Sequence, residues 1–261
     1  MITYLSENNT IIEIQNSKDM KFVNTFLFFI IVISVSAETI DKPLHKSNFT
    51  LSTELNMKYV WRGLEYSDAP VVFGTLSYDY KGFNAFVMGG YATNGKHSEV
   101  DLGLSYSNKY FTFGLSDYYY PSVSGEEDQY IKLNSHETGH SVECYLTLTP
   151  LQKVPVWMTL STYVFGADKK LNGNQAYSSY VELGYTHSFD DNNSLSLLVG
   201  ANLNKSFYTQ YEDGFNVSNI TAKYMTGISF GNFRLPISGS FIYNPYIDKS
   251  FFSLSIYFSS K

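Results

Sequence analysis

The sequence predicts an all-β fold: a transmembrane, antiparallel, up-and-down β-barrel of about 12 strands with both termini in the periplasm. From Phe49 to Phe258 the chain repeats units of roughly ten residues in which apolar and polar side chains alternate before a turn, which is typical of membrane-spanning strands. Aromatic girdles at two membrane interfaces would explain 23 tyrosines and 20 phenylalanines beside only two tryptophans. An apolar leader before the repeats indicates export.

The leader is the apolar stretch Phe22 to Val35, which follows Met20-Lys21 and precedes Ser36-Ala37. A basic start, an apolar stretch and small residues at the cleavage point are the three parts of a signal peptide. About 14 helical residues span roughly 21 Å, which is short of the roughly 30 Å hydrocarbon core, so a retained anchor is disfavoured. We therefore expect a mis-called start or disordered extension at 1–19, a cleaved signal peptide at 20–37, a short periplasmic segment at 38–48 and the barrel at 49–261.

Twelve segments carry the alternation, at about 49–62, 70–80, 83–92, 97–107, 110–120, 137–148, 155–165, 176–189, 194–204, 217–230, 233–243 and 250–258. Each is long enough to cross a bilayer as a tilted strand. Connections after the even-numbered segments are short and turn-like, such as Lys81-Gly82 and Asn108-Lys109, whereas most of those after the odd-numbered segments are longer. Short periplasmic turns and longer external loops alternate in this way in an even-stranded barrel.

Alternation assigns one apolar row of each segment to the lipid. The expected lipid-facing set includes Leu51, Leu55, Met57, Tyr59, Trp61, Val100, Leu102, Leu104, Tyr106, Val156, Met158, Leu160, Val181, Leu183, Tyr185, Leu195, Leu197, Val199, Phe233, Leu235, Ile237 and Phe241. The third segment is ambiguous, because Phe86 and Met88 compete with Val87 for this face. The last segment should pair with the first, because an open edge would leave backbone groups unsatisfied in lipid.

The opposite face would bring most of the strand charges into the lumen. These are Glu54, Lys58, Arg62, Asp79, Glu99, Asp101, Glu143, Glu182, Lys223 and Arg234. They could pair with one another and fill the barrel, because buried unpaired charge is costly. Alternatively they line a pore whose excess of acids favours cations or neutral polar solutes. Twelve strands lie between small, side-chain-filled barrels and wide porins, so size alone does not decide.

Two patterns suggest catalysis but lack the required context. The stretch from His136 to His140 matches the HExxH zinc motif, yet it runs into a strand, where the two histidines would lie about 13 Å apart. A lipid hydrolase needs a nucleophile beside an oriented histidine. Alternation places Ser141 and Glu143 on the opposite face from His140, and separates His187 from Ser188 in the same way. We therefore predict no enzyme, no catalytic residue, no metal and no cofactor.

Two expected external loops are acidic. Pro121 to Ser135 carries Glu126, Glu127 and Asp128, and Lys205 to Asn216 carries Glu212 and Asp213. Such loops can bind divalent cations or line a vestibule, or can be ordinary solvated loops. The net charge of -6 disfavours nucleic acid as a partner. The expected partners are outer-membrane lipid and lipopolysaccharide, the assembly machinery through the C-terminal strand, and small polar solutes.

The end of the first segment reads Lys58-Tyr59-Val60-Trp61-Arg62-Gly63, and with the leader it resembles the TorF-like porins, conserved hypothetical outer-membrane barrels of Gram-negative bacteria. Further likeness lies in Asp117 to Pro121 and in Glu143-Cys144-Tyr145. The C-terminus departs from a common barrel ending, because Ser259-Ser260-Lys261 follows Phe258. The resemblance implies a porin. With the predicted narrow charged lumen, we expect passive diffusion of small polar solutes or ions. A plugged structural or surface-interaction barrel and a membrane-embedded lipid hydrolase remain as alternatives.

Overall fold

The computed structural model describes residues 48–121, 130–149, 154–231 and 233–260. The expected extension and leader, and the loop acids Glu126, Glu127 and Asp128, lie outside the described residues. The barrel belongs to the unit formed by residues 48–261, which is described below. Among the described residues, no helix is long and apolar enough to cross a membrane.

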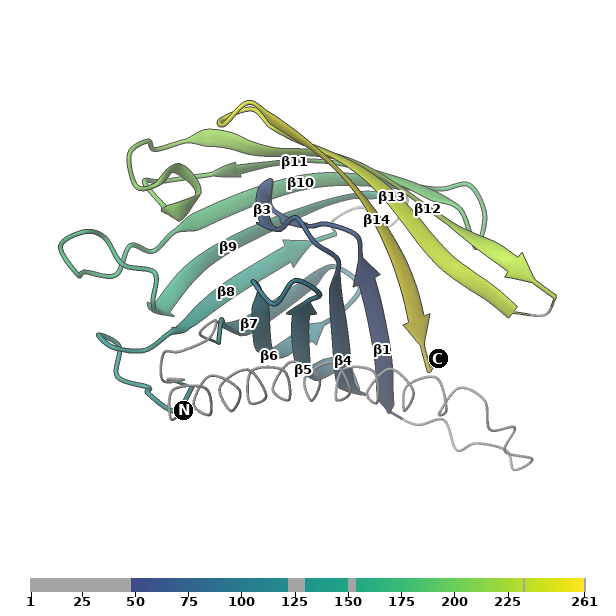
Figure 1. Ribbon diagram of the computed structural model, residues 1–261, viewed down its shortest axis with the longest axis horizontal. Coiled ribbons are helices and arrows are strands. Elements are labelled where there is room, and N and C mark those ends of the chain that lie inside the picture. The colour runs from purple at the N-terminus through teal and green to yellow at the C-terminus, as the bar shows by residue number, and fades with distance from the viewer. Residues whose placement is uncertain (1–47, 122–129, 150–153, 232, 261) are drawn as a thin grey trace, which may run out of the picture. The chain divides into compact units, whose positions relative to one another are not determined.

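Twelve strands of the described chain form one closed antiparallel barrel, in which each pairs with the next barrel strand and β14 pairs with β1 (Figure 1). This ring confirms the predicted up-and-down barrel and the predicted pairing of the last segment with the first. Its strands are β1 (Phe49–Asn56), β4 (Val71–Tyr80), β5 (Phe83–Ala92), β6 (Ser98–Ser107), β7 (Phe111–Tyr119), β8 (His140–Leu148), β9 (Val156–Gly166), β10 (Ser179–Ser188), β11 (Ser194–Asn202), β12 (Asn216–Phe230), β13 (Phe233–Asn244) and β14 (Lys249–Ser259).

The two ends of the barrel differ in the length of their connections. At one end most connections are short, and Lys81 and Gly82, between β4 and β5, have φ of 48° and 88°. Positive φ at both central residues is what a two-residue type I′ hairpin requires. The other end carries the longer connections, which include a small hairpin after β1 and the 3-10 helix η1 (Phe207–Thr209) between β11 and β12.

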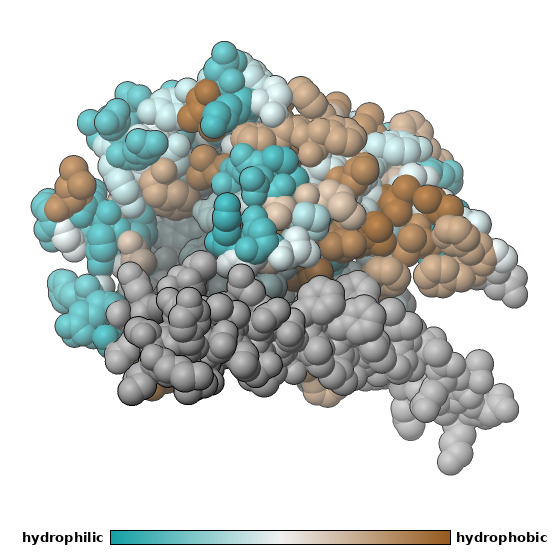
Figure 2. Space-filling model, viewed as in Figure 1, coloured by the Kyte–Doolittle hydropathy of each residue, from teal (hydrophilic) through white to brown (hydrophobic). Residues whose placement is uncertain are grey.

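Exposure separates the two faces of the barrel wall. Leu104 and Phe252 are 64% and 62% exposed, whereas Glu143 and Ser253 are 1% and 7% exposed. Alternate side chains of a closed barrel point outward and inward, so the apolar row lies outside and the polar row inside. A soluble sandwich has the reverse arrangement. On the face seen in Figure 2, apolar residues gather toward the end with tight turns and hydrophilic residues around the long connections.

The predicted first segment, 49–62, is wrong in its second half. β1 ends at Asn56, and the chain then forms a separate two-stranded sheet of β2 (Tyr59–Trp61) and β3 (Leu64–Ser67). Tyr59 and Trp61 therefore do not face lipid as predicted, because they belong to this hairpin and not to the barrel wall. The alternation ran on through both pieces, because a hairpin packed inside a barrel also has an apolar row and a polar row.

The third segment forms β5, and its ambiguous face is resolved by its neighbours. Val87 is 43% exposed and pairs with the exposed Leu76 and Leu102 on either side. Phe86 instead covers Gly103, where a side chain would overlap its ring. Gly103 therefore leaves room for Phe86 on the inner face, and Val87 occupies the outer face.

Candidate functional site: a constriction inside the barrel

The β2–β3 hairpin lies inside the ring, because its turn contacts β8, β12 and β13 (β3 is labelled in Figure 1). Its turn is Arg62-Gly63, with φ of 51° and 80°, and β2 and β3 pair only with each other. Near its base, the Tyr59 ring lies 4.9 Å from the ring of Phe73 on β4 and 5.3 Å from that of His97. An isolated two-stranded hairpin is marginally stable, so its place depends on contacts such as these.

Arg62 anchors the turn of the hairpin to the far wall. Its Nη1 and Nη2 donate to the two carboxylate oxygens of Glu143 on β8, at 2.6 and 3.1 Å. Nη1 also donates to the Tyr208 hydroxyl at 2.6 Å. The guanidinium carbon lies 4.2 Å from the ring centre of Trp61 and 4.6 Å from that of Tyr180 on β10. A bidentate ion pair with aromatic rings over the guanidinium is a strong, geometrically specific anchor.

Gly63, next to Arg62, lies directly against the wall. A side chain at this position would overlap the Ser218 carbonyl oxygen of β12. Asn244, at the end of β13, donates from Nδ2 to the Gly63 carbonyl at 3.1 Å. At the base, Ser253 of β14 donates from Oγ to the Lys58 carbonyl at 2.6 Å. The hairpin therefore touches strands on several sides of the ring and narrows its interior.

The connection between β11 and β12 also folds inward. Helix η1 places Tyr208 at 2% exposure, with its ring centre 5.2 Å from Tyr180 and 6.3 Å from Trp61. The tip remains outside: Glu212 is exposed, and Asp213 accepts a hydrogen bond from the Tyr246 hydroxyl at 3.0 Å. This acidic, aromatic-rich loop thus contributes a buried tyrosine to the constriction.

Hydrogen bonds around Asp168 hold this loop to the β9–β10 connection. Asp168 accepts hydrogen bonds from the backbone N–H and hydroxyl of Ser178, at 2.8 and 2.6 Å, and from the Tyr211 hydroxyl at 3.2 Å. The pKa of Tyr211 is raised to about 12, mainly by partial burial and to a smaller extent by the nearby Asp168 carboxylate. These hydrogen bonds therefore join the β9–β10 connection to the β11–β12 connection.

Three inner carboxyl groups lie on β6 and β10. Glu99 and Asp101 are 2% and 4% exposed; Glu99 Oε2 lies 3.2 Å from His97 Nε2, and Asp101 Oδ1 has no hydrogen-bond partner. Glu182 on β10 accepts a hydrogen bond from the Tyr180 hydroxyl at 3.2 Å. Neither Asp101 nor Glu182 lies within ion-pair distance of a basic side chain in the described chain.

The remaining predicted lumen residues pair with groups outside the predicted set, or stand apart. Lys58 forms an ion pair with Glu65 of β3, and Lys223 donates to the Tyr257 hydroxyl at 2.9 Å. Asp79 accepts a hydrogen bond from Asn84 at 2.8 Å. Glu54 lies opposite Tyr257 in the ladder, and Arg234 packs over Gly227. Of the ten predicted residues, the described structure joins only Arg62 and Glu143 as a mutual ion pair, so it does not form the ladder that would fill the barrel.

Sequence reasoning missed several members of the constriction: Glu65, His97, Tyr180 and Tyr208. Glu65 carries a local signal, because it lies seven residues after Lys58 and across the hairpin turn. Tyr208 carries none, because its hydrogen-bond partner is 146 residues away in the chain. Such a contact depends on closure of the barrel.

The histidine motif forms a structural contact at the rim. His140 Nδ1 lies 2.7 Å from Asp117 Oδ2, and Nε2 lies 2.6 Å from the Tyr130 carbonyl oxygen. Both ring nitrogens are therefore engaged, and neither faces a serine hydroxyl. His136 is exposed. Among the described residues, no group of three or more His, Cys, Asp or Glu side chains could hold a metal ion.

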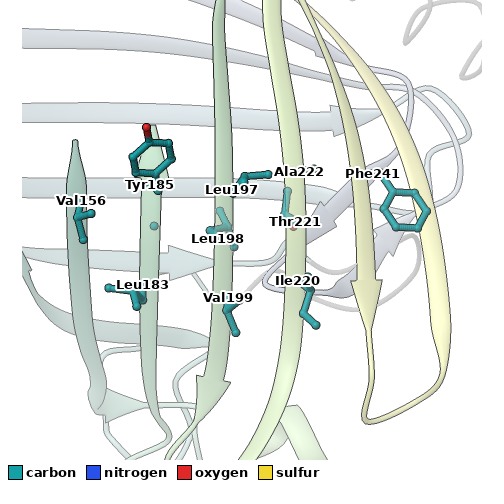
Figure 3. Close-up of a pocket in the computed structure, with 11 residues that line it drawn as sticks. Val156, Leu183, Tyr185, Leu197, Leu198, Val199, Ile220, Thr221, Ala222 and Phe241 are labelled. Carbon is teal, nitrogen blue, oxygen red and sulfur yellow. The ribbon is translucent and has the colours of Figure 1, made fainter. Parts of the chain in front are cut away.

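The outer wall carries a shallow apolar groove over β9 to β13 (Figure 3). Ala222 lies opposite Leu197 on one side and Phe241 on the other, and its small side chain leaves the dip between them. The exposed Val199 and Ile220 lie along it. This groove suits hydrocarbon rather than a polar solute, so the interior remains the candidate functional site.

No protein-family model matches the sequence, and no curated protein matches it. Among solved structures, the chain is similar to a KdgM porin, at 9% identity over 81% of this chain and 98% of that chain, with a TM-score of 0.45. It is also similar to a NanC porin, at 11% identity over 80% and 98% of the two chains, with a TM-score of 0.46. A third is the translocator domain of the autotransporter NalP from Neisseria meningitidis, at 10% identity over 93% and 98%, with a TM-score of 0.42. At such identities neither a solute nor a role carries over from one chain to another.

Proposed function

We propose that this chain is a porin-like channel of the bacterial outer membrane, through which small polar solutes or ions diffuse passively. The observation that carries the proposal is a closed barrel that is apolar outside and polar inside, with the β2–β3 hairpin narrowing its interior. A closed ring satisfies every ladder hydrogen bond without water, as a bilayer requires. A polar interior provides partners for a solute that has lost part of its hydration.

The hairpin gives the channel a defined narrow region. Near it, the inner side chains Glu143, Tyr208 and Asn244 are almost fully buried, whereas Lys223 and Tyr257 are only partly buried. We therefore place the constriction at the end with long connections and a wider vestibule at the end with tight turns. The size of the remaining passage would restrict transport to small solutes.

The topology in the cell belongs to the same proposal. The leader at 20–37 would be cleaved, the tight turns and both termini would lie in the periplasm, and the C-terminal strand would engage the assembly machinery. Membership of the TorF-like porins also remains part of this proposal, and rests on the Tyr59 to Gly63 stretch. Sequencing the mature N-terminus tests the leader, and a mature chain that begins before Glu38 would refute it.

Planar-bilayer recording of the purified, folded protein tests the transport function. We expect discrete conductance steps smaller than those of sixteen- to eighteen-stranded porins, because a barrel of twelve strands is narrower and contains a hairpin. Folding is checked on the same sample by heat-modifiable migration on a gel. Folded protein that inserts but never conducts would overturn the proposal.

A plugged barrel with a structural or surface-interaction role is the second candidate. Burial of the inner residues around Arg62 favours it, since Tyr180 and Tyr208 are 1% and 2% exposed. Liposome swelling distinguishes the two functions. Swelling in small sugars or amino acids supports a channel, whereas folded protein that leaves the liposomes impermeable supports a plug.

A further inference from the structure

The turn of the hairpin carries the guanidinium of Arg62 into the interior, and its charge is compensated. Both terminal nitrogens of Arg62 donate to Glu143, and aromatic rings flank the guanidinium. The Tyr118 hydroxyl donates to the same carboxylate at 3.0 Å. The paired groups together carry no net charge, and Glu143 is 1% exposed.

The carboxyl groups around this pair are less well compensated. Asp101 and Glu182 have no basic partner within ion-pair distance in the described structure, and Glu99 has only His97. Asp101 Oδ1 is buried without a hydrogen-bond partner. Once Arg62 is paired with Glu143, the ionisable groups that remain closest to the hairpin turn on β6 and β10 are therefore carboxyl groups.

We propose that Glu143 sets the charge selectivity of the lumen by neutralising Arg62, so that the neighbouring carboxyl groups make the passage favour cations over anions. This inference rests on the proposed channel function. An ion that crosses the barrel must pass the hairpin, whose turn lies against β8, β10 and β12. The screening length is about 10 Å at 0.1 M salt, and buried charges are screened less than exposed ones, so both members of the pair influence that ion.

Substitutions at the two residues of the pair should change the ion selectivity in opposite directions. Glu143→Gln leaves the positive charge of Arg62 uncompensated, and should lower the potassium-to-chloride permeability ratio by on the order of threefold. Arg62→Gln leaves the negative charge of Glu143 uncompensated, and should raise the ratio by a similar factor. The double variant removes both charges and should restore the ratio of the natural protein.

The measurement is the reversal potential in a potassium chloride gradient across a planar bilayer, for the natural protein and the three variants. Glu212→Gln is the matched control, because it removes one carboxylate at the exposed loop tip and should leave the ratio nearly unchanged. If the pair only holds the hairpin in place, both single variants would change the ratio in the same direction, and that result would overturn the inference. Unchanged ratios in conducting variants would also overturn it.

Failure of the channel itself gives a different result. If the folded natural protein never conducts, the proposed function fails and this inference fails with it. If Glu143→Gln does not fold, Arg62→Gln still tests the inference, because the permeability ratio for potassium over chloride is expected to rise in this variant. A ratio that stays constant or falls in Arg62→Gln would refute the role of the pair.

Discussion

Gly63 occupies a position in the hairpin turn that only glycine can fill. Its φ is 80°, and a side chain would overlap the Ser218 carbonyl oxygen. Left-handed backbone is readily adopted by glycine and costs other residues about 1 kcal/mol. The residue thus combines a conformational requirement with a close approach to the barrel wall.

Gly63→Ala should therefore displace the turn and disturb the Arg62 anchor. We expect the midpoint of heat-modifiable unfolding to fall and the single-channel conductance to rise or become noisy. Gly173→Ala is the control for backbone strain alone, because Gly173 has φ of 81° with open space around it. Equal effects of the two substitutions would show that contact with Ser218 is unimportant.

Tyr211 gives a pH-dependent prediction outside the membrane-spanning strands. Its pKa of about 12 in the folded protein exceeds the ordinary value of 10, because burial and Asp168 both disfavour tyrosinate. The contribution of this contact to stability is thus complete below pH 10 and is lost as the pH rises through about 12.

Ultraviolet titration of tyrosinate checks this value, with Tyr211→Phe used to isolate the signal by difference. Asp168→Asn should lower the pKa seen in the difference titration toward the ordinary tyrosine value, because the Asp168 charge is one cause of the raised pKa of Tyr211. A difference signal that already titrates at the ordinary value in the natural protein would contradict the Tyr211–Asp168 contact.

The β2–β3 hairpin is the element that distinguishes this barrel from a closed barrel with an unobstructed lumen. It joins the wall through side chains and has no ladder of backbone hydrogen bonds with it. Asn56 and Val71, the residues at which β1 ends and β4 begins, are direct partners in the barrel. The wall therefore continues beneath the hairpin, and β2 and β3 take no part in the ladder of the described barrel strands.

Replacement of residues 57–70 by a short Asn-Gly turn should leave a folded barrel with several-fold higher conductance. The physical reason is that β1 keeps its pairing with β4 and β14 while the obstruction is removed. Shortening 170–174 in the β9–β10 connection is the control, because that tip lies beyond the Lys169–Gln175 bridge. A folded excision variant with unchanged conductance would show that the hairpin does not limit passage.

Closure of the whole molecule depends on the seam between β1 and β14. Leu55 lies opposite Ile256, and Thr53 lies opposite Phe258. Pairing at this seam removes the last unsatisfied strand edges, which lipid would not tolerate. The apolar outer row and the polar inner row then face lipid and lumen on every strand.

A disulfide across the seam tests this register. In a Cys144→Ser background, Leu55→Cys with Ile256→Cys should cross-link under mild oxidation and shift the gel mobility of unfolded protein until reductant is added. The control pair is Leu55→Cys with Phe258→Cys, which lies two residues out of register. Efficient cross-linking of the control pair, but not of the test pair, would require a different closure.

Much of the wall could be predicted, because membrane-spanning strands are specified locally. The segment at 83–92 coincides with β5, and Lys81-Gly82 forms the tight turn that its residue types favour. Side chains two apart share a face whatever the rest of the chain does. Loop length and alternation therefore sufficed for the number and order of the barrel strands and for the facing of all of them except β5.

The constriction could be predicted only in part. Arg62 and Glu143 were both assigned inward, but Tyr59 and Trp61 were assigned to lipid, because alternation alone cannot tell a wall strand from a hairpin that folds inside. Tyr208 lies in an acidic loop that carries several aromatic residues, and alternation does not say which of them is buried. Its burial results from Arg62 and Tyr180, which only the closed ring brings to it.

The sequence by itself determined that this chain forms a closed barrel with an apolar outer face and a polar inner one, because that pattern follows from local alternation and from turn chemistry. Only the tertiary structure decided what occupies the interior. Closure brings β1 beside β14 and places Glu143, Tyr180 and Ser218 around the hairpin turn. Contacts between residues so far apart in the chain depend on the circumference and register of the ring, which no short stretch of sequence specifies.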